Sequence, residues 1–159
     1  MLEEQDFKKK CDAALEELRR RALRAADEKG FDVEAVSGKL EIVFEEPEEA
    51  KFVISPNTPV REIWVSALST SFKLGWNASR NAFVLEKTGE DLHAVMSRVI
   101  SQQLGKQVNA ALANADLRKR ILELGGEPMT MSPAELADYI AGETKKWAKV
   151  IKFAKIKAG

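Results

Sequence analysis

Cysteine, histidine and tyrosine are nearly missing from this chain of 159 residues, which contains one of each. A single cysteine, Cys11, excludes a disulfide within the chain. The single histidine, His93, leaves no partner set for a His-based triad and no His-rich metal site. No apolar run approaches a membrane span, and residues 1–10 hold no hydrophobic signal region. These absences favour a bacterial protein of the reducing cytoplasm with no membrane contact.

Motifs of enzymatic chemistry are missing as well. The chain has no glycine-rich phosphate loop, no Cys/His zinc spacing and no nucleophile elbow, so we expect no enzyme activity. The formal net charge is zero, which argues against a general binder of nucleic acid or anionic membranes. That balance hides an asymmetry: residues 1–105 hold 15 basic and 19 acidic side chains, whereas residues 106–159 hold 10 and 6.

One basic run could suggest a nucleic-acid partner, namely the four arginines between residues 19 and 24. Such runs are usually solvated helix faces, and Glu16 and Glu17 lie close enough on the same helix to neutralise part of the charge. We therefore expect no nucleic-acid partner.

Two amphipathic patterns predict long helices. Residues 4–29 carry apolar side chains at three- and four-residue spacing, with Cys11 as a small core residue and Gly30 as the stop. The second pattern runs from about Glu90 to Leu104 and is expected to end at Gly105. His93 follows an inner-face position and is expected on the flank or surface of this helix.

Short alternating segments between the helices predict six strands. They cover residues 31–36, 40–44, 52–54, 62–66, 72–74 and 82–86, with Pro56 and Pro59 marking the loop before the fourth. Two helices flanking such strands predict an α+β sandwich, with both helices packed on one face of an antiparallel sheet.

The fourth strand places a tryptophan opposite its apolar residues. Ile63 and Val65 fall on one face, and Trp64 falls on the other between Glu62 and Ser66. If Ile63 and Val65 point to the core, Trp64 is an exposed aromatic with polar neighbours, a common anchor for a protein partner. Alternation alone leaves open that another element covers Trp64. A sheet with helices on one face only favours exposure.

The segment around this strand resembles the central signature of the frataxin family. The matching positions are Pro59, Ile63-Trp64, Ser66, Ser69 and Trp76. The resemblance runs from about Glu4 to Gly105 and also includes residues 38–44, 83–85, 88–90 and 92–103. It implies a frataxin-like domain over residues 1–105 and a monomer that regulates iron–sulfur cluster assembly.

The resemblance implies that the sheet face of Trp64 contacts a cysteine desulfurase and the iron–sulfur scaffold protein. Trp64 and Ser66 match the family's contact positions, and Asn57 is close to a family Gln. Glu62 replaces the usual Gln, and Ser55 replaces an Asn often found before the loop. Lost amide donors can leave partner groups unpaired, so these departures weaken the implied interface.

Weak iron binding by surface carboxylates is also implied by the resemblance. Glu28, Asp32 and Glu34 match acidic positions at the end of the first helix and on the first strand. The helix positions where bacterial members carry acids are instead arginines, and guanidinium groups repel a cation: Arg19, Arg20 and Arg24. The acidic segment Glu45–Glu49 is a second candidate, although such a cluster is more often a solvated turn.

From Lys106 the chain changes character. An Ala-rich helix is predicted over residues 108–115, a short basic helix over 116–124, and a short strand over 127–131. Ser132-Pro133-Ala134-Glu135 is a strong helix start, and the helix is expected to reach about Phe153. Residues 106–159 are therefore expected to form a mainly helical C-terminal extension.

Parts of the extension resemble the C-terminal end of the periplasmic solute-binding proteins of tripartite tricarboxylate transporters. The matching segments are residues 108–112, 118–128, 133–135 and 143–150. Almost all of that family's carboxylate-binding cleft is missing here, so no ligand site is implied. The alternative to a regulator is thus a fused or chimeric module, natural or engineered, in which Tyr139 and Trp147 are structural.

Overall fold

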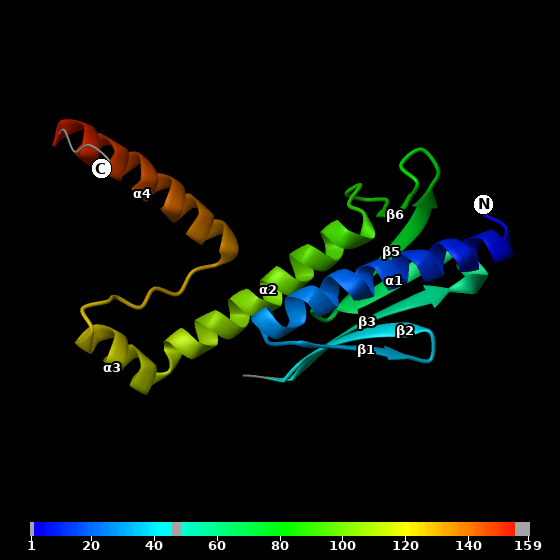
Figure 1. Cartoon of the computed structure of the whole chain (residues 1–159), viewed down its shortest axis with the longest axis horizontal. Helices are drawn as coiled ribbons and strands as arrows, with labels where there is room; N and C mark the ends of the chain where they lie inside the picture. Colours follow the sequence, from blue (N-terminus) through cyan, green and yellow to red (C-terminus); the bar gives the residue numbers. More distant parts are fainter. Residues whose placement is uncertain (1, 46–48, 155–159) are drawn as a thin grey trace. The chain divides into compact units, whose positions relative to one another are not determined.

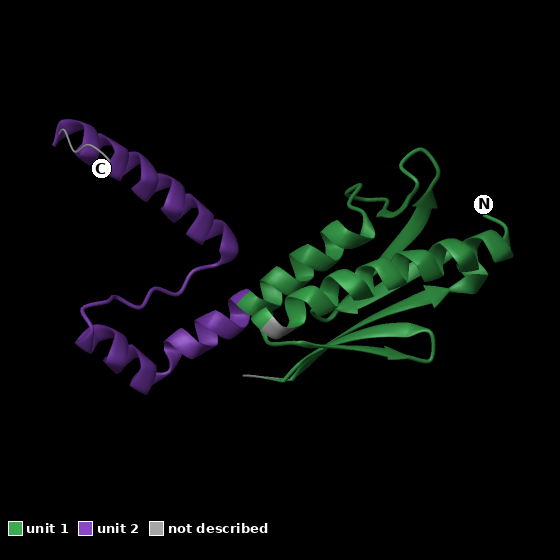
Figure 2. Ribbon diagram, in the orientation of Figure 1, with its two compact units in different colours: residues 1–104 green, residues 105–159 purple. Residues whose placement is uncertain are grey.

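The computed structural model describes residues 2–45 and 49–154, and the chain divides into two compact units, residues 1–104 and 105–159 (Figure 2). Unit 1 starts with helix α1 (Glu4–Lys29) and ends within helix α2 (Leu92–Ala113). Its strands are β1 (Asp32–Val36), β2 (Lys39–Phe44), β3 (Ala50–Asn57), β4 (Glu62–Ala67), β5 (Thr70–Asn77) and β6 (Ala82–Leu85). A short 3-10 turn, η1 (Thr58–Val60), precedes β4.

The strands form one antiparallel sheet in which each strand pairs with the next along the chain, in the order β1-β2-β3-β4-β5-β6. Helices α1 and α2 lie side by side on one face of this sheet (Figure 1). The predicted α+β sandwich is confirmed.

The core lies between the sheet and the two helices. Each of the central strands turns alternate apolar residues inward, and Ile54, Ile63 and Leu74 are fully buried. From the helices, Phe7 and Val95 are buried to the same degree, and the Phe7 ring meets Phe83 edge-on at 5.8 Å between centroids. Full burial of one such side chain contributes about 1.5–3 kcal/mol, so this layer holds the sheet in its register.

The ends of the helices follow the predictions at one helix and depart from them at the other. Gly30 caps α1 in the left-handed conformation, at φ 67°, and its N–H donates to the carbonyl of Ala26 at 2.9 Å. Such a conformation is easy only for glycine, which confirms the predicted stop. Gly105, in contrast, does not end α2, which continues to Ala113. The separate Ala-rich helix predicted over residues 108–115 is therefore wrong, because residues 108–113 extend α2.

A second correction concerns β3. Pro56 was expected in the loop before the fourth strand, but β3 includes it and pairs it with Ile63 of β4. Only Pro59 lies in the connection, inside η1.

Unit 2 adds helices α3 (Ala115–Glu123) and α4 (Pro133–Phe153). The predicted capping box is confirmed at α4: the Ser132 hydroxyl accepts from the Glu135 N–H, and the Glu135 carboxylate accepts from the Ser132 N–H. The strand expected over residues 127–131 is wrong, since this segment has no strand pairing. The Asn109 side chain instead hydrogen-bonds to both backbone groups of Met131. It donates to the Met131 carbonyl at 2.9 Å and accepts from the Met131 N–H at 3.1 Å. Within residues 2–45 and 49–154, no helix is long and apolar enough to cross a membrane.

Candidate partner-binding face

Strand β4 separates core from surface residue by residue. Ile63 and Val65 are fully buried, whereas Trp64 is partly exposed and Ser66 is exposed. The alternation predicted for this strand is therefore confirmed. Ile63 and Val65 point into the core, on the sheet face that α1 and α2 cover (Figure 1), so Trp64 stands on the opposite face.

Strand register brings the five predicted partner-binding residues together. On β3, Ser55 lies directly opposite Trp64, and Asn57 lies opposite Glu62. Because residues directly opposite in an antiparallel pair project to the same face, these side chains share one surface with Ser66. Strand β5 adds Lys73 opposite Trp64. We call this surface the Trp64 face: Ser55, Asn57, Glu62, Trp64, Ser66 and Lys73.

The indole of Trp64 is held by its neighbours on the sheet. Its Nε1–H donates to the Glu62 carboxylate at 2.8 Å, and the Lys73 ammonium lies 4.7 Å from the ring centroid. A cation over an exposed tryptophan contributes about 0.5–1 kcal/mol. These two contacts fix the orientation of the ring. Glu62 and Lys73 cover only part of the indole, and the rest is open to solvent.

Sequence reasoning missed Lys73. Residues 72–74 are predicted only as a strand, and the strand register shows that Lys73 lies opposite Trp64. Glu62 was considered as a substitute for an amide, and its hydrogen bond to the indole could not be foreseen from spacing alone.

The outer face continues with polar contacts toward β2. Lys51 pairs with Glu41 at 2.9 Å across β3 and β2, and this hydrogen bond, with the nearby charges of Glu34 and Glu49, raises the pKa of Lys51. Glu34 lies opposite Glu41 on β1. This surface combines one aromatic ring with paired charges and with amide and hydroxyl groups. Such a combination is suited to binding a protein partner.

The predicted metal ligands do not form a cluster. Glu28 lies in the last turn of α1, and Asp32 and Glu34 lie on β1, all exposed. In the described parts of the chain, no group of three or more His, Cys, Asp or Glu side chains could hold a metal ion. Most of the second candidate, Glu45–Glu49, lies outside the described residues. Iron binding at Glu28, Asp32 and Glu34 stays a prediction.

The arginines of α1 are largely tied to acids of the same helix. Arg19 pairs with Glu16 at 3.3 Å, and Arg20 and Arg21 both pair with Glu17. These pairs lower the pKa of Glu17 through hydrogen bonds from Arg21 and Arg20. At Arg19 and Arg20, two of the three positions where the frataxin resemblance would place acids, the helix therefore presents ion pairs.

Neither Cys11 nor His93 faces the Trp64 face. Cys11 is 1% exposed in the core, and burial, with a smaller contribution from the Asp12 charge, raises the pKa of its thiol to about 12. A thiol with so high a pKa is a poor nucleophile, as expected for a core residue. His93 is partly buried beside α1, and burial and the Arg21 charge lower its pKa.

Comparisons with known proteins agree with this geometry. The sequence profile of the frataxin-like domain matches residues 1–106. The iron-sulfur cluster assembly protein CyaY of Ralstonia nicotianae (strain ATCC BAA-1114 / GMI1000) is 34% identical over 64% of this chain and 88% of that protein. The protein of the same name from Janthinobacterium sp. (strain Marseille) is 31% identical over 70% of this chain and 98% of its own length.

A solved structure of frataxin from Psychromonas ingrahamii shares the fold. It covers 64% of this chain and 91% of its own, with a TM-score of 0.50 and 16% sequence identity. The six-stranded antiparallel sheet with its two helices, together with the profile match and the similar curated proteins, shows that the chain belongs to the frataxin-like family.

Proposed function

We propose that this protein is a cytoplasmic, monomeric regulator of iron–sulfur cluster assembly that docks on a cysteine desulfurase and its scaffold protein through the Trp64 face. The similar curated proteins are named iron-sulfur cluster assembly proteins, which supports the assignment to this process. The observation that carries the docking site is the partly exposed Trp64, held between Glu62 and Lys73 on the sheet face opposite α1 and α2.

The arrangement around Trp64 favours binding because the ring is oriented before the partner arrives. Ordering a free side chain on association costs about 0.5–1.5 kcal/mol, and the contacts from Glu62 and Lys73 reduce that cost. Ser55, Asn57 and Ser66 surround the ring with hydroxyl and amide groups that can bond to a partner's backbone. The protein itself transfers no sulfur in this proposal, and it changes the rate of transfer by occupying the complex.

The test is the affinity of Trp64→Ala for the desulfurase–scaffold complex, measured by biolayer interferometry alongside desulfurase activity. Truncation of an interface hot spot costs at least about 2 kcal/mol, so we expect affinity to fall about 30-fold or more. Trp147→Ala is the matched control, because Trp147 is 54% exposed on α4 and lies outside the Trp64 face. A Trp64→Ala protein that binds and regulates like the parent would refute the docking site.

Glu62→Gln separates charge from ring orientation. The Gln side-chain oxygen can still accept the indole N–H, while the negative charge is lost and an amide donor is gained. Because the frataxin resemblance places Gln at this position, we expect Glu62→Gln to bind the complex at least as tightly as the parent. Weaker binding would show that the carboxylate itself contacts a positive group of the partner.

Iron binding is a secondary part of the proposal. Among the described residues, Glu28, Asp32 and Glu34 do not come together as a group of three that could hold a metal ion, and Arg19 and Arg20, each ion-paired with a glutamate, stand where the frataxin resemblance would place acids. We therefore expect only weak, surface binding of Fe²⁺, with water filling most of its shell. Paramagnetic broadening of amide signals under anaerobic Fe²⁺ titration should centre on β1, and it should need millimolar metal.

For residues 106–159 we propose an appended helical module without a retained ligand site. None of the described residues of α3 and α4 is buried, which supports the absence of a carboxylate-binding cleft there. Calorimetric titration with small di- and tricarboxylates should give no heat of binding. A saturable heat would instead favour a solute-binding role for this module.

A further inference from the structure

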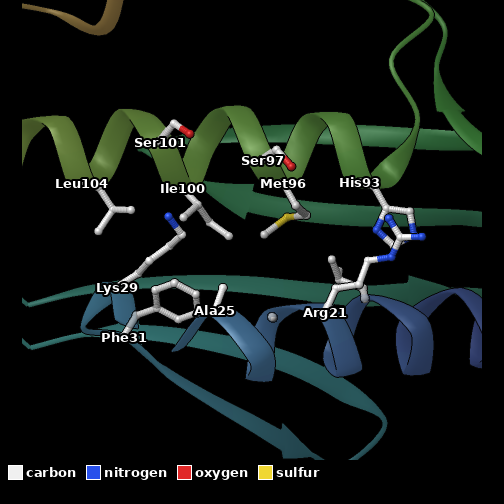
Figure 3. A pocket seen from close by; sticks show the side chains of 12 residues that line it. Arg21, Ala25, Lys29, Phe31, His93, Met96, Ser97, Ile100, Ser101 and Leu104 are labelled. Atoms are coloured by element: carbon white, nitrogen blue, oxygen red, sulfur yellow. The ribbon is translucent and has the colours of Figure 1, made fainter. Parts of the chain in front are cut away.

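A groove of about 220 Å³ lies between α1 and α2, within unit 1 and away from the Trp64 face. Its apolar surface comes from both helices and from the residue just before β1: Ala25, Phe31, Met96, Ile100 and Leu104 (Figure 3). Phe31 and Met96 are buried, whereas Ala25 and Ile100 are partly open to solvent. The floor is therefore part of the core, and the upper walls are accessible.

The polar rim of this groove is basic. Lys29 reaches from α1 across the opening toward Ile100 of α2, and the Arg21 side chain extends toward His93 at the other end (Figure 3). No acidic residue is among the described residues that line the groove. Arg21 is ion-paired through its Nε with Glu17 at 2.7 Å, while Lys29 forms no ion pair in the described parts of the chain.

An apolar slot with an unneutralised ammonium at its mouth is complementary to an amphipathic anion. We propose that the groove binds a medium-chain fatty carboxylate, with the chain over Phe31, Met96 and Ile100 and the carboxylate on Lys29. This site is independent of the docking function proposed for the Trp64 face. The ligands expected there share two features, a straight apolar chain and one negative charge.

The volume of the groove sets the length of the chain. A space of 220 Å³ corresponds to about seven water-sized groups, which is the size of an octanoate tail. Burial of one methylene is worth about 0.8 kcal/mol, so affinity should rise about fourfold with each added carbon. The rise should stop near eight carbons, because further methylenes would remain in water.

The charge of Lys29 should have a smaller effect. The ammonium is on an exposed residue, and exposed ion pairs are weak, so its loss should reduce octanoate affinity about two- to fivefold. Octylammonium, which has the same chain and the opposite charge, should bind more weakly than octanoate. This difference distinguishes a site with a charged mouth from a purely apolar one.

The test is a titration of the full-length, ¹⁵N-labelled protein with butanoate, hexanoate, octanoate and decanoate, followed by amide chemical shifts. We expect saturable shifts over residues 25–31 and 96–104, with the predicted dependence on chain length. Ala25→Leu should abolish them by filling the groove, and leucine keeps a high helix propensity. Ala94→Leu is the matched control on the exposed side of α2. The charge is tested by Lys29→Gln, with the two- to fivefold loss given above, and Lys9→Gln at another exposed lysine of α1 is its control.

Three results would overturn the proposal. One is the absence of saturable shifts at these residues with octanoate. Another is octanoate binding by Ala25→Leu as tight as that of Ala94→Leu. The third is a set of shifts centred on the exposed apolar residues of α4, such as Ile140 and Trp147, since it would place the chain on that helix instead.

Discussion

Ile63 and Trp64 are neighbours on β4 whose side chains lie on opposite faces of the sheet, so truncating each tests the assignment of faces. Ile63 is fully buried. Ile63→Ala removes three carbons, which at about 0.8 kcal/mol each costs about 2.4 kcal/mol in transfer free energy alone. The cavity that remains adds to this, and we expect a total loss of about 3–4 kcal/mol in the free energy of unfolding.

Trp64→Ala removes a larger side chain but should cost less. The identifiable losses are the hydrogen bond to Glu62, about 0.5–1.5 kcal/mol net, and the contact with Lys73, about 0.5–1 kcal/mol. These two contacts alone predict a loss of about 1–2.5 kcal/mol, and the partly exposed ring leaves no closed cavity behind. Ile63 should therefore contribute more than Trp64 to the free energy of unfolding, whereas Trp64 should contribute more to partner binding.

The assay is urea unfolding at pH 7, followed by far-UV circular dichroism and by tryptophan fluorescence in a Trp147→Phe background, in which the remaining tryptophans, Trp64 and Trp76, both belong to unit 1. Trp76 reports on unit 1 because its ring packs against Phe83 at 5.2 Å between centroids. The reasoning fails if Trp64→Ala lowers the unfolding free energy as much as Ile63→Ala does. Trp64 would then be a core residue, and its loss could not be assigned to the interface.

Three further predictions concern single residues. Because burial raises the pKa of Cys11 from 9.0 to about 12, its thiolate fraction at pH 8 should be about a thousandfold below that of a free thiol, and labelling by a thiol reagent should require unfolding. The pKa of His93 is lowered from 6.5 by burial and Arg21, so the unfolded chain binds more protons. The free energy of unfolding should fall as pH drops from 6.5 through the folded pKa, and His93→Gln should remove this component. Asn109→Ala should accelerate hydrogen exchange at the Met131 amide without changing exchange in the core of unit 1.

The sheet was predictable because its residues alternate. Large apolar residues recur at every second position, as at Phe52 and Ile54 or Ile63 and Val65, and the buried face that results leaves one register for each strand. Strand ends were less predictable. Pro56 is a frequent loop residue, yet it sits inside β3, because the pairing of Ser55 with Trp64 and of Asn57 with Glu62 holds the strand on both sides of it.

Five members of the Trp64 face were predictable, but Lys73 and the contacts among the six residues were not. Resemblance and alternation identified Trp64 and its polar neighbours, since both depend on order along one strand. Lys73 joins the face through pairing between β4 and β5, and the register of that pairing is set by the turn at Leu68 and Ser69, both at positive φ. Two non-glycine residues in that conformation carry no clear signal in the sequence.

Gly105 shows why the second helix was misjudged. Glycine in a helix interior costs about 1 kcal/mol relative to alanine, which makes it a reasonable stop when only local propensity is considered. In the structure α2 continues through it, and a Cβ added at this position would lie 3.4 Å from the Pro133 ring. Such a Cβ would make an ordinary van der Waals contact, so the start of α4 lies close to α2 at this point, where the Asn109 side chain also binds Met131. Contacts with a segment far along the chain thus offset the local cost, and they are not visible in a window around the glycine.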